Sequence, residues 1–327
     1  MNLHENPSLF REAVRFTAEQ MGILDIYVEK DYWVTKALSL IFSDPIGAEV
    51  VFKGGTALSK CYGLIDRFSE DIDLVVLSRK GESGSKLKGK LKAIYNVVER
   101  VMPEVEIVGV TNKLGMIRKT AHEYPMIFSG KFGQVRDKVI LESSTLGHYE
   151  PFHEQTINSF IYDMMRSTNQ NELITQYRLE PFTVQVLDVK RTVCEKILSL
   201  VRFSHSENPI ADLKMKIRHL YDLHRILGEE NIRAFILSSD FEVMINRVGQ
   251  DDVVGYRSNN SWLNLHPKEA LIFADLDAVW KELETTYTMD FRGLVYGSFP
   301  SSEQVLSTLK FLAERMTGIV WEVRVEL

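Results

Sequence analysis

The 327-residue chain has only two cysteines, Cys61 and Cys194, which are too few for a disulfide framework. We interpret both as reduced core residues. Long hydrophobic runs are also lacking, since no stretch approaches the roughly 18 apolar residues of a membrane-spanning helix. The start of the chain has neither the basic residues nor the apolar core of a secretion signal. These absences predict a cytoplasmic protein with no membrane partner.

An excess of basic residues is missing as well, because 39 Lys and Arg stand against 45 Asp and Glu for a net charge of −6. This balance argues against a protein that coats nucleic acid along an extended basic face, although a local basic patch could still dock one RNA end. Two common nucleotide-binding patterns are absent too: the Walker Gly-x-x-x-x-Gly-Lys-Ser/Thr and the dinucleotide Gly-x-Gly-x-x-Gly. P-loop and Rossmann folds are therefore not expected.

Apolar periodicity predicts an N-terminal α/β lobe over residues 1–150 and a mainly helical lobe over residues 151–327, hence an α+β protein. Expected strands cover residues 49–53, 72–77, 106–111, 124–128, 138–142 and 182–187. Expected helices cover residues 7–22, 26–42, 56–63, 87–101, 189–203, 211–227, 231–248, 267–285 and 302–316. No internal repeat or low-complexity segment is present.

Two carboxylates, Asp71 and Asp73, lie two residues apart on the apolar strand expected after residue 70. Because side chains alternate along a strand, both point to the same side. Such a pair suits a divalent cation, which prefers several hard oxygen ligands. Burying two like charges side by side is unfavourable without a cation, although a salt bridge from Arg67 could offset one of them. We therefore predict a metal site here.

A glycine turn precedes that strand and opens into a short helix. The backbone N–H groups of Gly54, Gly55 and Thr56, at the positive end of the helix, suit a phosphate group. The alternative is an ordinary turn capped by Thr56. Together with the carboxylates, the turn is suited to a nucleoside triphosphate. Glu142, at the end of the apolar run 138–142, either supplies a third acidic metal ligand or is an exposed strand-end residue.

Lysine is concentrated in the polar segment that follows. Residues 79–92 carry six basic side chains and three glycines. We interpret this segment as a solvated surface loop leading into a helix, with contact to a phosphate backbone as the alternative. Further along, Lys196 lies in an apolar helix, where an unpaired ammonium is unfavourable.

These motifs resemble the AbiEii/AbiGii toxin family of the DNA polymerase β-like nucleotidyltransferase superfamily. Two segments carry most of the resemblance: KGGTALSK at residues 53–60 and RFSEDIDL at residues 67–74. Three more fit it: EKDYWV at 29–34, EKILSLVR at 195–202 and RHLYDL at 218–223. The resemblance covers roughly residues 25–225. One departure is His219, where family members often have aspartate.

The resemblance implies an NTP-dependent, Mg²⁺-dependent nucleotidyltransferase toxin of a type IV toxin–antitoxin or abortive-infection system. It implies a mixed sheet in the first lobe, a second lobe that completes the active-site cleft, and a cognate antitoxin as a partner. Nucleotide would pass to an acceptor, with the tRNA 3′ end as the expected one. Asp71 and Asp73 would hold two Mg²⁺, typically about 3.5–4 Å apart.

The same resemblance assigns the remaining site residues. Lys196 would touch the triphosphate and be oriented by Asp222, with a structural Lys–Asp pair as the alternative. Nucleotide-binding candidates are Gly54, Gly55, Thr56, Lys60, Arg67 and Ser69, of which Ser69 would also assist the metal shell. Catalytic candidates are Asp71, Asp73, Lys196 and Asp222.

Two rival functions remain open. The first is a nucleotidyltransferase that modifies small molecules such as aminoglycosides, which predicts an acidic pocket for a polycation; the lysines of residues 80–92 argue against it. The second is an NTP-binding module that no longer catalyses a reaction. Such a module would be expected to lack a site carboxylate, whereas Asp71 and Asp73 are both present.

Overall fold

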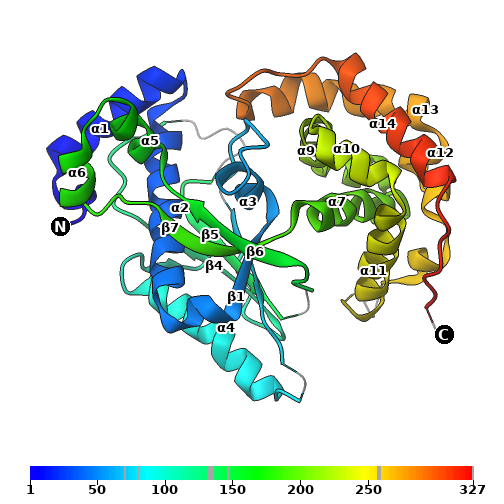
Figure 1. Cartoon of the computed structure of the whole chain (residues 1–327), viewed down its shortest axis with the longest axis horizontal. Coiled ribbons are helices and arrows are strands. Elements are labelled where there is room, and N and C mark those ends of the chain that lie inside the picture. Colours follow the sequence, from blue (N-terminus) through cyan, green and yellow to red (C-terminus); the bar gives the residue numbers. More distant parts are fainter. Residues whose placement is uncertain (70, 80, 131–135, 146–147, 256–258, 326–327) are drawn as a thin grey trace. The chain divides into compact units, whose positions relative to one another are not determined.

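The structure, a computed structural model, describes residues 1–69, 71–79, 81–130, 136–145, 148–255 and 259–325 (Figure 1). The chain forms two compact units. Unit 1 comprises residues 1–63 and 67–187, and unit 2 comprises residues 64–66 and 188–327. We describe each unit by itself.

Unit 1 contains a seven-stranded sheet in the order β3-β4-β5-β2-β1-β7-β6. The strands are β1 (Val50–Lys53), β2 (Asp71–Val76), β3 (Glu104–Val105), β4 (Ile117–His122), β5 (Val139–Ser144), β6 (Phe152–Ile157) and β7 (Phe182–Leu187). The sheet is mixed: β1 is antiparallel to β2 and parallel to β7, and β2 is parallel to β5. This arrangement confirms the predicted fold class, an α/β part with a mixed sheet followed by a mainly helical part.

Several predicted boundaries differ from the structure. The sheet-bearing unit extends to residue 187, past the expected boundary at residue 150, because β6 and β7 pair with each other and β7 pairs with β1. Strand β6 was not predicted, since this edge strand alternates exposed and half-buried side chains and carries little apolar signal. The strands predicted at residues 106–111 and 124–128 were wrong; between these two segments lies β4, which pairs with β5.

The helices of unit 1 are α1 (Pro7–Met21), α2 (Asp25–Ser43), α3 (Gly54–Lys60), α4 (Gly84–Glu99), α5 (Phe160–Ser167) and α6 (Asn171–Gln176). Helix α2 is buried over most of its length, including its charged residues Glu29, Lys30 and Asp31. The carboxylate of Glu29 accepts the backbone N–H groups of Ile127 and Phe128 at 2.6 and 3.0 Å. Those bonds satisfy a buried charge and explain why the 124–128 segment runs as irregular chain.

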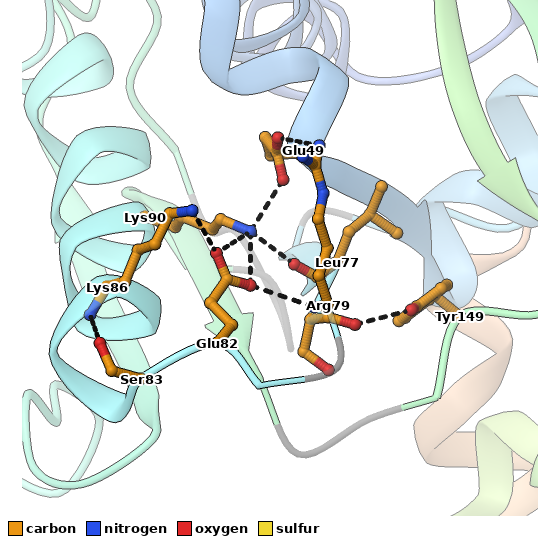
Figure 2. Close-up of polar contacts among 9 residues, drawn as sticks. Glu49, Leu77, Arg79, Glu82, Ser83, Lys86, Lys90 and Tyr149 are labelled. Atoms are coloured by element: carbon orange, nitrogen blue, oxygen red, sulfur yellow. Dashed lines mark hydrogen bonds and ion pairs between the residues drawn. The ribbon is translucent and has the colours of Figure 1, made fainter.

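The lysine-rich segment is helical from Gly84, because Ser83 caps α4 by accepting the N–H of Lys86. One of its lysines is buried. Lys90 Nζ lies 2.8 Å from Glu49, 2.9 Å from Glu82 and 2.7 Å from the Leu77 carbonyl oxygen (Figure 2). Lys90 therefore ties α4 to the end of β2, whereas Lys88 and Lys92 remain exposed.

Unit 2 is mainly helical over its described residues. Its helices are α7 (Val189–Ser204), α8 (Pro209–Met215), α9 (Ile217–Ile226), α10 (Glu230–Leu237), α11 (Ser239–Gly255), α12 (Leu271–Ala274), α13 (Leu276–Thr285) and α14 (Ser302–Thr317). Helix α7 contacts α8, α9, α11 and α12, which makes it the centre of the bundle. Within the described residues of the whole chain, no helix is long and apolar enough to cross a membrane.

The short segment 64–66 belongs to unit 2 although its neighbours in sequence belong to unit 1. Its last residue, Asp66, pairs with Arg225 at 2.6 Å. The Asp66 backbone N–H donates to the Tyr221 hydroxyl at 3.2 Å, and its carbonyl accepts from the N–H of Tyr296 at 2.9 Å. Side-chain and backbone bonds thus both fix this segment in the helical unit.

Candidate functional site

A row of four charged residues crosses the sheet of unit 1. Lys53 on β1 is the register partner of Asp73 on β2, Asp73 is the partner of Glu142 on β5, and Glu142 is the partner of Lys119 on β4. Directly paired residues point to the same face of a sheet, so two carboxylates lie between two ammonium groups. Asp71, two residues before Asp73, shares this face. The structure therefore brings the predicted carboxylates Asp71, Asp73 and Glu142 to one face.

The surroundings of Asp73 disfavour its ionised form. Burial raises the pKa of Asp73 to about 7, and the negative charges of Asp71 and Glu142 act in the same direction. Lys53 and Lys119 partly oppose that effect. Asp71 Oδ1 is a buried oxygen without a hydrogen-bond partner. An unsatisfied buried carboxylate oxygen beside a second carboxylate fits a cation.

The glycine turn lies against these carboxylates. Gly54 has φ +81°, a backbone conformation that favours glycine, and a Cβ placed there would lie 2.2 Å from Asp73 Oδ2. A Cβ on Gly55 would lie 2.7 Å from Ser69 Oγ and 2.8 Å from Arg67 Nη2. The absence of both side chains thus lets the turn approach Asp73, Arg67 and Ser69 closely.

The hydroxyl of Thr56 links the turn to β2. Thr56 Oγ1 lies 2.6 Å from the Asp71 carbonyl oxygen, to which it donates, and 3.1 Å from Ser69 Oγ. Arg67 is buried, and its Nη1 donates to the Phe68 carbonyl. The predicted residues Gly54, Gly55, Thr56, Arg67 and Ser69 therefore cluster around the carboxylate pair.

Lys60 departs from this pattern. It is the last residue of α3, whereas Gly54 and Gly55 are the first. Its ammonium pairs with the buried carboxylate of Asp31 at 2.6 Å and donates to the Asn158 carbonyl at 3.1 Å. These contacts give Lys60 a structural role, and we do not retain it as a phosphate-binding residue.

Glu142 has an ion-pair partner that its sequence position did not reveal. Its Oε2 lies 2.9 Å from Lys119 Nζ, and both side chains are about one third exposed, at 37% and 28%. Burial lowers the pKa of Lys119, but its hydrogen bond to Glu142 and the negative charge of Glu142 raise it above the usual value, with smaller contributions from Asp71 and Asp73. No local motif marks Lys119; only the antiparallel pairing of β4 with β5 brings it to the site.

Metal-binding capacity rests on the carboxylate pair. Over the described ranges of the chain, no group of three or more His, Cys, Asp or Glu side chains is arranged to hold a metal ion. The three-ligand set with Glu142 thus stays a prediction. Asp71 and Asp73 by themselves fit a divalent cation, since Asp71 Oδ1 is buried and unsatisfied and cations of this class complete their shells with water or substrate oxygens.

The second predicted pair lies wholly in unit 2. Lys196 on α7 and Asp222 on α9 are 2.7 Å apart, with side chains 7% and 0% exposed. His219, one turn before Asp222, places its Nδ1 3.3 Å from Lys196 Nζ. The ammonium therefore bridges a carboxylate and an imidazole. This geometry fits both a structural pair that joins two helices and a lysine held ready for an anionic ligand.

The chain matches the model of a known protein family. A family model described as "Nucleotidyl transferase AbiEii toxin, Type IV TA system" matches residues 38–308. The match includes both central motifs and continues well past residue 225, where the resemblance seen in the sequence ended. No curated protein matches the chain.

Proposed function

This chain belongs to the AbiEii family of nucleotidyl transferase toxins of type IV toxin–antitoxin systems, and we propose that it transfers a nucleoside monophosphate from an NTP to the 3′ end of an RNA, with tRNA as the acceptor. The family supplies the reaction class, and the acceptor is our own extension. The observation that carries the proposal is the Asp71–Asp73 pair, with its unsatisfied oxygen, directly beside the glycine turn.

In this proposal Asp71 and Asp73 hold Mg²⁺, which when bound neutralises charge on the triphosphate and on the attacking oxygen. Gly54, Gly55 and Thr56, with Arg67 and Ser69 beside them, position the triphosphate. The RNA 3′-hydroxyl attacks the α-phosphorus, the bond from that phosphorus to the β-bridging oxygen breaks, pyrophosphate leaves, and the hydroxyl proton passes to solvent.

Lys196 and Asp222 complete the proposed catalytic set on the strength of the family resemblance. Asp222 would hold the Lys196 ammonium in one position, as their 2.7 Å separation and low exposure support. The ammonium would then bind the triphosphate as a compact point charge. A cognate antitoxin is the partner proposed for the toxin.

The test is incubation of the purified protein with each α-³²P-labelled NTP, Mg²⁺ and total RNA, followed by gel separation. We expect label in a tRNA-sized band with the wild type and none with Asp73→Asn, which keeps the shape of the side chain. Label on small molecules alone would support the aminoglycoside-type alternative. Tight NTP binding without any labelled product would overturn the enzymatic proposal in favour of a binding module.

A further inference from the structure

A polar hollow lies in unit 1, between α2, the turn before α5 and the segment that joins α6 to β7. It encloses about 410 Å³ of empty space, counting the part open to solvent. None of its lining residues belongs to the charged row on the sheet or to the glycine turn. The hollow is thus a separate place on the molecule to which the proposed reaction assigns no role.

Two cations line this hollow: Lys36 of α2 and Arg178. Lys36 is half-buried, and its Nζ donates to Asn2 Oδ1 at 2.8 Å. Across the part of the chain that the structure describes, neither cation has a carboxylate within ion-pair distance. Glu180 also lines the hollow and, like Arg178, is exposed, and the carboxylate of nearby Glu5 is bonded to Asn2.

The two positive charges act on each other. Burial lowers the pKa of Lys36; the negative charge of Glu5 opposes that effect, and the positive charge of Arg178 lowers the pKa further by a smaller amount. A half-buried ammonium is poorly solvated, so an anion that enters the hollow would gain from its charge and from that of the guanidinium. The lining also offers the hydroxyl of Tyr177, which accepts from Asn6 Nδ2 at 3.3 Å and so keeps its own proton to donate.

The backbone at Arg178 gives an independent indication. Arg178 has φ +54°, the left-handed conformation that glycine usually supplies just after a helix. It lies two residues past the end of α6, and the N–H of the following Leu179 donates to the Ile174 carbonyl at 3.0 Å. Arginine thus takes a conformation here that glycine would adopt more freely, at a residue that lines the hollow.

We propose that this hollow is a binding site for a small oxyanion, a phosphate or carboxylate group carried by a small molecule, held between Lys36 and Arg178. The ammonium and the guanidinium supply charge-assisted hydrogen bonds, and Tyr177 supplies a neutral one. The site is independent of the proposed nucleotidyl transfer.

The experiment follows acetylation of each lysine by an N-hydroxysuccinimide ester, with mass spectrometry as the readout, while inorganic phosphate is titrated against chloride of equal ionic strength. We expect phosphate to protect Lys36 with a saturating dose response, and to leave the exposed Lys88 unprotected. Because Lys36 is read directly, phosphate bound at the glycine turn does not contribute to the signal. Acetate titrated in a second arm shows whether a carboxylate binds more tightly than phosphate; saturable protection by either anion supports the site.

Arg178→Gly removes the guanidinium and relieves the backbone, so the variant should fold at least as well as the wild type. It should need about tenfold more phosphate for the same protection of Lys36. The matched control is Asn169→Gly, which relieves a similar φ of +59° after α5 but lies outside the hollow. In this control, phosphate should protect Lys36 as well as it does in the wild type. The proposal is overturned if neither anion protects Lys36 beyond the chloride control, or if the two variants behave alike.

Discussion

Gly54 and the Asp73 carboxylate are so close that a side chain on Gly54 would clash with it: a Cβ on Gly54 would lie 2.2 Å from Asp73 Oδ2. Gly54→Ala should therefore displace the carboxylate as well as strain the backbone at φ +81°. We expect nucleotidyl transfer to be lost and unfolding free energy to fall by about 1–3 kcal/mol.

Gly63→Ala is the control, since Gly63 also has positive φ (+61°) but has nothing within 4 Å of the added carbon. It should lower stability by about 1 kcal/mol through the backbone alone and keep activity. Equal activity losses in the two variants would contradict the role of the Gly54–Asp73 approach.

Asp73→Asn should separate stability from activity. Without a bound cation, the Asp73 carboxylate is destabilised by burial and by repulsion from Asp71 and Glu142. Replacing it with a neutral amide should therefore raise the thermal midpoint, while nucleotidyl transfer is abolished. Added Mg²⁺ should raise the midpoint of the wild type and have little effect on the variant. Thermal denaturation of both proteins with EDTA or Mg²⁺ checks this. If Mg²⁺ stabilises both to the same extent, the cation is not held by this carboxylate.

Lys196 can be tested for a catalytic as against a structural role by a paired substitution. Lys196→Met alone leaves the fully buried Asp222 without its cation and should lower unfolding free energy by about 3–5 kcal/mol. The double variant Lys196→Met, Asp222→Leu removes both charges and should recover most of that stability. We expect activity to stay absent in the double variant, as measured by labelled-NTP transfer alongside urea unfolding. Recovery of activity together with stability would make the pair structural only.

The buried imidazole of His122 predicts a loss of stability in mild acid. Its Nδ1–H donates to the Met102 carbonyl at 2.9 Å, and its Nε2 lies 2.9 Å from the hydroxyl of Thr120, so the neutral ring is fully bonded. Burial lowers the pKa of His122 below 6.5. The unfolded chain then takes up a proton that the folded chain does not, so the stabilisation is complete above pH 6.5 and decreases as pH falls below it.

The slope from this one group is at most about 1.4 kcal/mol per pH unit. Urea unfolding of the wild type and of His122→Gln at pH 7.5, 6.5 and 5.5 measures it. His4, His205 and His224 have pKa values lowered by burial in the same way and contribute to both proteins, so the difference between the two isolates His122. Identical pH profiles would show that the pKa of His122 is the same in the folded and unfolded states.

Local sequence patterns predicted the parts of the site that local geometry determines. The two-residue spacing of Asp71 and Asp73 fixes their common face, and the structure places the glycine turn beside them. Lys119 could not be found this way, because its place depends on which residues of β4 pair with β5. The predicted strands around β4 were wrong, so the register that brings Lys119 to Glu142 was out of reach.

Lys60 shows the converse limit. Its position in KGGTALSK suggested a phosphate contact, but a seven-residue helix separates its side chain from the turn and directs it to Asp31, which is distant in the sequence. Edge strand β6 was missed for a related reason, since a strand that faces solvent on alternate residues gives no apolar run to detect.

The assignment of Leu64–Asp66 to the helical unit has a practical consequence for anyone who divides this protein. The polypeptide passes from one unit to the other three times, so neither unit is a single continuous stretch of the sequence. A fragment truncated after Leu187 retains Asp66 but loses Arg225, Tyr221 and Tyr296, while residues 188–327 expressed alone lack the tripeptide. Domain swaps between relatives therefore have to exchange both segments together.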